Sequence, residues 1–246
     1  MTDNNVTRAA RLDTATLSDA LDKCGINGQC HRIKPRSTEF RMAGRAWTLL
    51  YGPAGKPSGT VGDYIDDVPE GSVIVLDNGG VDNATVWGDI LTEVAHNRRI
   101  AGTVIDGVNR DVSLCLELGY PVFSRDNYMR TGKDRVQVEA TQVPVNIGGA
   151  RVAPGDILKG DTDGVVVIPK EHEDEVLKVA EAHKTGRHTC DHGGGLDLFA
   201  PHWCGRAGDA QRTRCGNAQP VHGLAAKELA DRAAQHGTPV AHAGIG

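Results

Sequence analysis

Two short stretches hold acidic and basic side chains at a spacing that would let them act together. The first is Gly88-Asp89-Ile90-Leu91, and the second is Arg110-Asp111. Twenty residues separate Asp89 from Arg110. Two carboxylates suit a hard divalent cation with oxygen ligands, such as Mg²⁺ or Mn²⁺. A guanidinium can hold an oxyanion through two parallel donors. Together these groups would stabilise an enolate or a carboxylate-bearing carbonyl compound.

The flanking sequence predicts that the two stretches meet at one edge of a sheet. Residues 71–78 (GSVIVLDN) and 101–106 (AGTVID) are short apolar runs typical of strands buried on both faces. Between them, residues 85–97 carry the apolar stripe of an amphipathic helix. In such a βαβ unit, the start of the helix and the end of the second strand lie at the same edge. The N–H groups of residues 88–91 would then face a small carboxylate or phosphate at the positive end of the helix dipole.

The same residues also have a purely structural interpretation. An Arg-Asp pair after a strand is often a surface ion pair or a helix cap, and an aspartate at a helix start is ordinary dipole compensation. The spacing alone therefore leaves both roles open for Asp89, Arg110 and Asp111.

The rest of the core is predicted to contain further helices, a long loop and a β layer. Residues 14–23 have helical spacing, with Thr14 or Thr16 as the N-cap. Residues 52–62 (GPAGKPSGTVG) form a loop rich in Gly, Pro and Ser, and residues 171–183 an amphipathic helix with an acidic first turn. Strands are predicted at residues 44–50, 135–140, 144–147, 157–158 and 164–168, and a short helix at residues 111–118.

The chain is predicted to divide into two parts of different composition. Residues 1–183 form the core domain, and residues 184–246 form a C-terminal extension rich in Gly, His and Cys. Within the extension, only residues 222–236 have a convincing helical pattern. A changed reading frame and a lineage-specific extension both remain open as explanations of this composition.

The composition argues against several classes of protein. Lys and Arg total 27 against 32 Asp and Glu, a net charge of −5, which does not suit a nucleic-acid groove or a polybasic membrane surface. No apolar run approaches the roughly 18 residues of a membrane span, and the first residues lack an apolar signal-peptide core. Cys24, Cys30 and Cys115 are predicted to be reduced, mostly buried thiols. We therefore expect a soluble, cytoplasmic protein that binds neither nucleic acid nor membrane.

Six motifs of the core, taken together, resemble those of one known family: that of the class II 4-hydroxy-4-methyl-2-oxoglutarate (or 4-carboxy-4-hydroxy-2-oxoadipate) aldolases and the RraA-like regulators of ribonuclease E. The resemblance runs from about residue 17 to residue 183. The motifs are Asp77-Asn78-Gly79-Gly80, Gly88-Asp89-Ile90-Leu91, residues 101–107 (AGTVIDG), Arg110-Asp111, Pro154-Gly155-Asp156 and residues 160–169 (GDTDGVVVIP).

The resemblance implies an architecture and a set of site roles. The fold would be α/β, an αββα sandwich of the swivelling phosphohistidine-domain type with a βαβ active-site unit, assembled as a homotrimer or homohexamer. Asp111 would bind Mg²⁺ or Mn²⁺, and Asp89 would reach the metal through water. Arg110 would contact the carbonyl of a pyruvyl group, and the backbone amides of Gly88, Asp89, Ile90 and Leu91 would hold its carboxylate.

The chemistry that the resemblance implies is retro-aldol cleavage of a 4-hydroxy-2-oxo acid to pyruvate and a second oxo acid. The same pyruvate enolate would account for oxaloacetate decarboxylase activity. No lysine lies near Asp89 or Arg110-Asp111 in the sequence, which fits a metal-dependent lyase rather than one that forms a Schiff base.

Two departures from the family pattern bear on the substrate. Asn109 and Arg99 stand where apolar or small residues are expected, and Asn109 is next to Arg110. In aldolase members an acidic residue of a neighbouring subunit completes the site, and no residue of the extension can be assigned to that role. A non-catalytic regulator that binds a ribonuclease, and a related lyase or hydrolase with another substrate, therefore remain alternatives. The distal half of the substrate is not predicted.

Overall fold

Strand β2 (Met42–Pro53) organises the main sheet, because it pairs with three other strands. The computed structural model describes residues 3–190 of the chain. β2 runs parallel to β3 (Val73–Asp77) and antiparallel to β6 (Val136–Thr141) and β9 (Ile157–Asp161). The other strands are β1 (Lys34–Pro35), β4 (Gly102–Asn109), β5 (Val122–Asn127) and β10 (Gly164–Ile168), which complete the order β1-β5-β4-β3-β2-β9-β10. Because β1 also contacts β10, the sheet nearly closes on itself.

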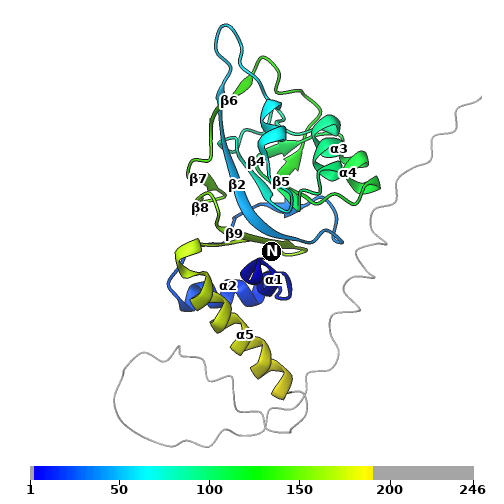
Figure 1. Cartoon of the computed structure of the whole chain (residues 1–246). Coiled ribbons are helices and arrows are strands. Elements are labelled where there is room, and N and C mark those ends of the chain that lie inside the picture. Colours follow the sequence, from blue (N-terminus) through cyan, green and yellow to red (C-terminus); the bar gives the residue numbers. More distant parts are fainter. Residues whose placement is uncertain (1–2, 191–246) are drawn as a thin grey trace, which may run out of the picture. The chain divides into compact units, whose positions relative to one another are not determined.

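Strands β2, β3, β4 and β5 run parallel, and two helices lie against one face of this part of the sheet (Figure 1). Helix α3 (Asp89–Asn97) connects β3 to β4, and helix α4 (Val112–Glu117) connects β4 to β5. Every residue of β3 and β4 is buried, which explains why their sequences are nearly continuous apolar runs. The predicted βαβ unit is therefore confirmed, as is the α/β class. The more specific phosphohistidine-domain sandwich stays a prediction.

A small hairpin, β7 (Val145–Ile147) with β8 (Ala150–Val152), lies on the side of β2 away from α3 and α4 (Figure 1). Two buried aspartates hold it in place. Asp77 Oδ2 accepts the Asn146 N–H at 2.9 Å, and Asp106 Oδ2 accepts the Gly148 N–H at 2.7 Å. These two carboxylates therefore have a structural role in the described part of the chain, because both bond to N–H groups of the hairpin.

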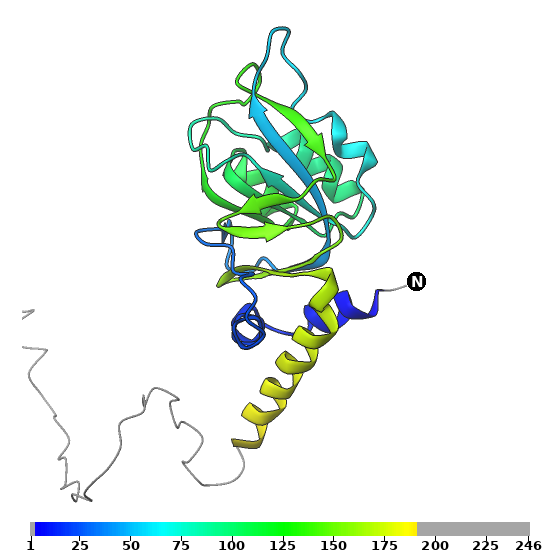
Figure 2. The same ribbon diagram turned by 90° about the vertical axis from the view of Figure 1, so that its left-hand side faces the viewer.

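A second layer of helices packs against β9 and β10. Helices α1 (Asn4–Ala10), α2 (Thr14–Lys23) and α5 (Glu173–Cys190) lie beside one another below these strands in both ribbon views (Figures 1 and 2). Burying one Leu or Ile side chain of this layer contributes about 1.5–3 kcal/mol. The shared apolar cluster includes Leu17, Leu21, Ile157, Val166, Ile168 and Leu177.

Ion pairs tie the same helices to β2. Arg45 of β2 donates from Nε to Asp3 Oδ2 at 2.7 Å, and its terminal nitrogens contact the Glu173 carboxylate. Hydrogen bonds from Arg45 lower the pKa of Asp3. Burial alone would raise the pKa of Glu173, but the hydrogen bonds from Arg45 and Asn5 outweigh it and the pKa is lowered.

We expect this network to make stability depend on pH. Because the pKa values of Asp3 and Glu173 are lower in the folded chain than in the unfolded one, their contribution is present at neutral pH and is lost on acidification through about pH 5 to 3. Arg45→Gln should cost about 1–2 kcal/mol of unfolding free energy at pH 7, measured by urea denaturation. The loss of unfolding free energy should be smaller at pH 3. An equal loss at pH 7 and pH 3 would contradict the role given to the ion pairs of Arg45.

Several predicted element boundaries differ from the observed ones: β2, for example, covers residues 42–53 where a strand was predicted at residues 44–50. Three further differences concern helices. Helix α3 begins at Asp89 rather than at residue 85, because Thr85 is extended and bridges Val108 and Thr131. The N-cap of α2 is Asp13, whose carboxylate accepts the Thr16 N–H, and neither Thr14 nor Thr16 has that role. Helix α5 continues past the predicted domain boundary at residue 183. The rest of the predicted extension, residues 191–246, lies outside the described residues.

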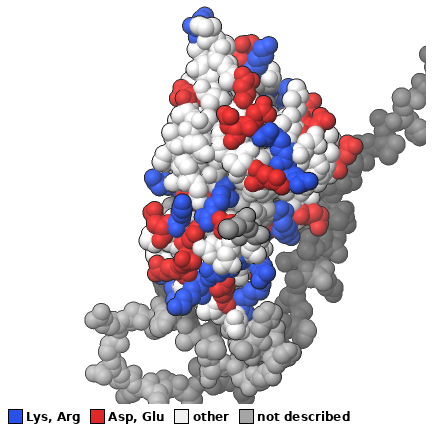
Figure 3. Space-filling view, viewed as in Figure 1, with Lys and Arg blue, Asp and Glu red and all other residues white. Residues whose placement is uncertain are grey.

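Charge, helix length and thiol burial can be described for residues 3–185. On the face in Figure 3, acidic and basic side chains are interspersed, without a broad patch of one sign. Between residues 3 and 190, none of the helices has the length and apolar character needed to cross a membrane. Cys30 and Cys115 are buried free thiols and Cys24 is half-buried, as predicted. Burial raises the pKa of Cys115 to about 11.

Candidate active site

Asp111 occupies the turn between β4 and α4 in a left-handed conformation, with φ 55° and ψ 42°. A non-glycine residue in this region costs about 1–3 kcal/mol, although Asp tolerates it better than most. The conformation has a clear consequence. The Asp111 carboxylate does not cap its own helix but points to the start of α3, where Oδ2 accepts the Asp89 N–H at 3.1 Å.

Arg110 links the same two elements. Its N–H donates to the Trp87 carbonyl oxygen at 3.0 Å, which fastens the end of β4 to the residues before α3. Its Nε lies 3.2 Å from Asp111 Oδ2, and both side chains are a little over one-third exposed. The guanidinium can therefore reach a ligand in the open cleft while one of its nitrogens stays paired.

Gly88 is needed where these groups converge. A Cβ at this position would lie 2.8 Å from Asp111 Oδ2, closer than Cβ atoms approach other atoms, and 3.1 Å from Arg110 Nε, so these side chains would have to move. The φ of −151° is extended backbone that any residue adopts. Gly88 is therefore required by the close approach of Asp111 and Arg110, and not by its backbone conformation.

Two of the first-turn N–H groups of α3 already have carboxylate acceptors. The Asp89 N–H is bonded to Asp111, and the Ile90 N–H donates to Asp89 Oδ1 at 2.8 Å. Both acceptors are negatively charged groups at the positive end of a helix dipole, which stabilises them. A ligand carboxylate at this helix end would compete with Asp89 and Asp111 for these donors, and a cation that attracts the two carboxylates would leave the donors available.

A cleft of about 470 Å³ opens beside Arg110 and the start of α3. Trp87 lies in its floor and is held by stacking on Tyr120, with ring centroids 6.1 Å apart, and by a hydrogen bond from Nε1 to Thr92 Oγ1. One wall is the short 3₁₀ helix η1 (Asp63–Asp67), which follows the predicted loop. The lining residues are Val61, Gly62, Asp63, Ile65, Asp66, Thr85, Val86, Trp87, Gly88, Asp89, Ile90, Leu91, Val94, Arg110 and Thr131.

A second cleft, of about 380 Å³, lies on the other side of Arg110. Its remaining lining comes from Asp111 and the next two residues and from the end of β5. Arg110 therefore lies between two hollows, and both are open to a small ligand. The lining residues are Arg110, Asp111, Val112, Ser113, Asn127, Tyr128 and Met129.

The donors present fit a hard divalent cation held by few protein ligands. Asp89 and Asp111 face the same edge, and each carboxylate has one oxygen to which the structure gives no hydrogen bond within the described part. Mg²⁺ typically takes one or two carboxylates and keeps several waters. Among residues 3–185, whose side chains the structure describes, no group of three or more His, Cys, Asp or Glu side chains gathers as a cage. The carboxylate pair therefore suits Mg²⁺ or Mn²⁺ better than a structural zinc.

The structure brings the predicted residues of the site together. Gly88, Asp89, Arg110 and Asp111 converge at the edge of the parallel strands, and Ile90 and Leu91 line the cleft beside them. Sequence reasoning missed the wall formed by η1. The one signal for it was a pair of apolar residues, Tyr64 and Ile65, between aspartates directly after the loop.

The two unusual residues have different surroundings. Asn109 is buried and accepts the Ser124 hydroxyl at 2.8 Å, so its amide pairs with the neighbouring strand rather than with a ligand. Arg99 is exposed, lies at the far end of α3 and pairs with Glu70 at 3.3 Å. Neither side chain is among those that line the two clefts.

The chain is an α/β protein, and its candidate site lies at the carboxyl ends of parallel strands, where ligands bind in open α/β sheets. The family model RraA-like, described as Aldolase/RraA, matches residues 14–167. The chain therefore belongs to the RraA-like family.

Two relatives and two solved structures illustrate the similarity. Protein DlpA of Legionella pneumophila is 45% identical over 169 residues, which cover 67% of this chain but only 27% of DlpA. A protein of Halalkalibacterium halodurans named "Putative 4-hydroxy-4-methyl-2-oxoglutarate aldolase" is 32% identical over 72% of this chain and 81% of its own length. An uncharacterized protein from Pseudomonas syringae has a TM-score of 0.71 and 41% identity, covering 76% of this chain and 90% of its own. Streptomyces coelicolor RraAS2, titled an unusual member of the RNase ES inhibitor RraA protein family, has a TM-score of 0.71 and 26% identity, covering 78% and 98%.

Proposed function

We propose that this chain is a divalent-metal-dependent lyase that cleaves a 4-hydroxy-2-oxo acid to pyruvate and a second oxo acid. The observation that carries the proposal is the convergence of Arg110, Asp111 and the start of α3 at one sheet edge. These residues lie within the range matched by the family model. The Halalkalibacterium halodurans relative, which matches this chain over 81% of its own length, is named "Putative 4-hydroxy-4-methyl-2-oxoglutarate aldolase".

Each site residue has a role that its surroundings allow. Arg110, with its guanidinium partly exposed between the two clefts, would bind the C2 carbonyl oxygen and stabilise it as negative charge develops. N–H groups of residues 88–91 would hold the C1 carboxylate at the helix dipole. Asp111, with Asp89 through water, would hold Mg²⁺ or Mn²⁺, which supplies Lewis-acid polarisation of the oxo acid when bound.

The bond changes follow from these positions. Asp89, acting through a water molecule, would take the proton from the C4 hydroxyl group, and the C3–C4 bond would break as a carbonyl forms at C4. The electron pair would move through C3 and C2 onto the oxygen held by Arg110, which gives the enolate of pyruvate. Protonation of C3 then completes pyruvate. In oxaloacetate, loss of CO₂ would generate the same enolate, which would give the proposed decarboxylase activity.

The test is pyruvate release from 4-hydroxy-4-methyl-2-oxoglutarate and from oxaloacetate, with Mg²⁺ or Mn²⁺ and again with EDTA. We expect release that depends on the metal, is lost in EDTA and returns when metal is added in excess. Equal rates with and without metal would rule out the metal-dependent mechanism. The absence of pyruvate from both substrates, with the full chain folded and metal present, would count against the lyase.

Gly88→Ala should separate site geometry from stability. The added Cβ would displace Asp111 or Arg110, so we expect pyruvate release to fall by about a hundredfold, as for a misplacement near 1 Å. The unfolding free energy should change by less than about 1 kcal/mol. Gly55→Ala is the matched control, because the nearest atom to its Cβ would lie at an ordinary 3.5 Å. Equal activity of the two variants would contradict the role of Gly88.

A non-catalytic regulator that binds a ribonuclease is the second candidate, and one observation favours it. Four large apolar side chains are exposed near the two clefts or on α4; Ile90 is 72% exposed and Met129 is 75% exposed. Exposed apolar side chains of this kind suit a contact with another protein. They would equally suit the predicted homotrimer or homohexamer. Salt-sensitive retention of a ribonuclease by the full chain, without metal-dependent pyruvate release, would favour the regulator. The four residues are Ile90, Leu116, Tyr128 and Met129.

A further inference from the structure

Strand β4 ends one residue before Arg110, and its pairing with β5 is irregular near that end. Ile105 pairs with Ser124. Val108, three residues further along β4, pairs with Asp126, which is only two residues beyond Ser124. This is the pattern of a β-bulge, which bends a strand and changes the direction of the side chains beyond it. Because successive side chains of a strand alternate between its two faces, the register after the bulge decides where Arg110 points.

A buried hydrogen bond between side chains joins the same two strands beyond the bulge. The Ser124 hydroxyl donates to Asn109 Oδ1 at 2.8 Å, and the two residues are 0% and 1% exposed. The Ser124 hydroxyl oxygen also lies 2.9 Å from the Asp126 carbonyl oxygen. The Asn109 carbonyl oxygen in turn accepts the Tyr128 N–H at 2.9 Å. Because a buried polar group is costly to leave without a partner, the bond between Ser124 and Asn109 fixes the register of β4 on β5 at this point.

Asn109 also contacts Arg110 directly. Its Nδ2 donates to the Arg110 carbonyl oxygen at 3.4 Å, which is a long hydrogen bond. On the other side of the residue, the Arg110 N–H donates to the Trp87 carbonyl oxygen at 3.0 Å. Both peptide groups of Arg110 are therefore held, one by Asn109 and one by Trp87. With the backbone fixed in this way, Arg110 Nε lies 3.2 Å from Asp111 Oδ2.

An amide side chain is unusual in a strand that is buried along its whole length, where an apolar or small residue is expected. Burying an amide costs free energy unless its oxygen and nitrogen find partners, and Asn109 finds them in Ser124 and Arg110. Asn109 lines neither cleft, so its amide does not serve to bind a ligand there. Both Asn109 and Ser124 are buried within one chain, so their contacts do not depend on a neighbouring subunit.

We propose that the buried pair of Asn109 and Ser124 positions Arg110 at the edge of the sheet. The inference rests on the proposed function for the part that Arg110 takes in the reaction. Asn109 and Ser124 are positioning residues, because they act through the backbone of Arg110 and touch no ligand themselves. Without them, the peptide group between Arg110 and Asp111 would shift. The guanidinium would then leave its place between the clefts, and the Asp111 carboxylate would move away from the Asp89 N–H.

The test is the double variant Asn109→Val/Ser124→Ala in the full chain. Because both polar partners are replaced by apolar side chains, neither substituted position keeps an unpaired polar side chain, and the fold should be retained. Amide hydrogen exchange, followed by NMR, measures the Arg110 N–H bonded to Trp87 and the Asp89 N–H bonded to Asp111. We expect both N–H groups to exchange at least about tenfold faster than in the unaltered chain. Exchange at the unaltered rate would overturn the inference.

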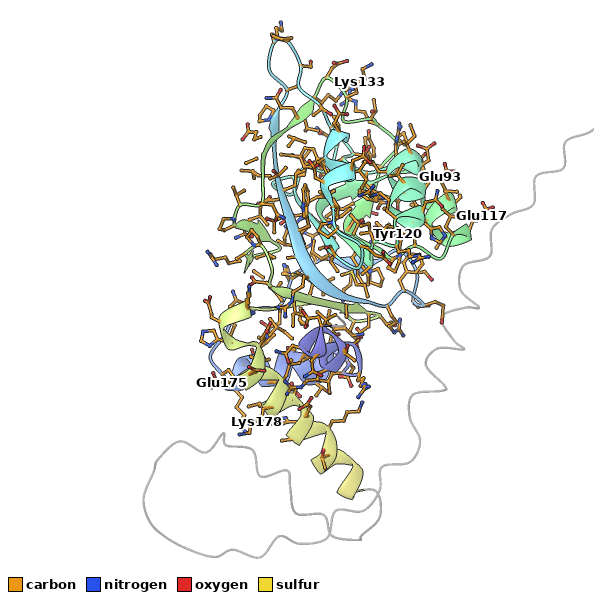
Figure 4. All side chains as sticks on the ribbon, viewed as in Figure 1. Glu93, Glu117, Tyr120, Lys133, Glu175 and Lys178 are labelled. Atoms are coloured by element: carbon orange, nitrogen blue, oxygen red, sulfur yellow. The ribbon has the colours of Figure 1, made fainter. Side chains whose placement is uncertain are left out.

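Thr103→Val is the matched control. Thr103 Oγ1 and the hydroxyl of Tyr120, which follows α4 (Figure 4), form another buried hydrogen bond of β4, at 2.8 Å. This bond lies at the opposite end of β4 from Arg110. Its loss leaves the Tyr120 hydroxyl without this partner, so the midpoint of urea unfolding should fall at least as far as in the double variant. The exchange of the Arg110 and Asp89 N–H groups should nevertheless stay within about twofold of the unaltered rate. Equal acceleration in both variants would mean a general loosening of the sheet and would overturn the inference.

Steady-state kinetics of pyruvate release give a second readout and separate the inference from the proposed function. In the double variant we expect kcat to fall by about tenfold or more and KM to stay within about threefold, because a misplaced guanidinium weakens stabilisation of the transition state more than binding of the substrate. An unchanged kcat would overturn the inference and keep the lyase. Faster exchange of both N–H groups, in a protein whose unaltered chain releases no pyruvate, would keep the positioning role and contradict the lyase.

Discussion

Replacing Arg110 with alanine is expected to lower pyruvate release by about a thousandfold, with the chain still folded. The guanidinium is the one cation that lines either cleft in the described part, so no other side chain there can take over stabilisation of the enolate oxygen. Arg110→Lys should recover only part of the loss, because an ammonium group cannot donate in the same fixed fork to a ligand and to Asp111. Steady-state rates of pyruvate release, together with a urea unfolding curve, measure both effects.

Arg99→Ala is the control for this prediction. Arg99 has the same side chain and an ion pair with Glu70, but it is 80% exposed and lies at the opposite end of α3. Its loss should change the unfolding free energy by less than about 0.5 kcal/mol and leave the rate unchanged. An Arg110→Ala variant as active as Arg99→Ala would exclude the proposed role of Arg110.

The sequence was sufficient to predict which elements position the site, because the hydrophobic patterns of these elements are local. The apolar runs of β3 and β4 and the stripe of α3 each lie within a few residues, and parallel connection then brings Gly88 and Arg110 to one edge. The pairing of the two stretches therefore needed no knowledge of distant contacts. The types of β3, α3, β4 and α4 were predicted on the same basis, whereas α1, β5 and η1 were not predicted.

The features that the sequence left undecided depend on contacts between distant segments. Helix α3 starts late because Thr85 bridges Val108 and Thr131, which are remote in sequence. The carboxylate of the left-handed Asp111 accepts the Asp89 N–H, a contact between residues 22 positions apart in the chain. Asp63 reaches the cleft because η1 packs beside α3. None of these contacts produces a periodic pattern.

The structure also refines the two interpretations that the spacing left open for Asp111. The residue does form an ion pair with Arg110, so the structural role is present. A surface ion pair contributes only about 0–1 kcal/mol. Left-handed aspartates also occur away from the site, as at Asp134 with φ 63°, so the backbone conformation of Asp111 does not separate the two roles. A substitution that keeps its shape and removes its charge distinguishes the two roles.

Asp111→Asn is that substitution. We expect it to lower the rate of metal-dependent pyruvate release to about a thousandth of the original rate or less. Asparagine tolerates the left-handed conformation, and its amide oxygen can still accept the Asp89 N–H, so the fold should be retained. What is lost is the negative charge that would hold the cation. Binding of Mn²⁺, followed by calorimetry, should therefore weaken in parallel with the rate, by at least about tenfold.

Asp134→Asn is the matched control for charge and backbone together. Asp134 is also a left-handed aspartate, with φ 63°, and it is exposed in the turn before β6. Its amide variant should keep the rate and the Mn²⁺ affinity of the unaltered chain, since it lines neither cleft. If Asp111→Asn instead behaves like Asp134→Asn in both measurements, Asp111 is a structural residue that pairs with Arg110, and the cation must be held elsewhere or not at all.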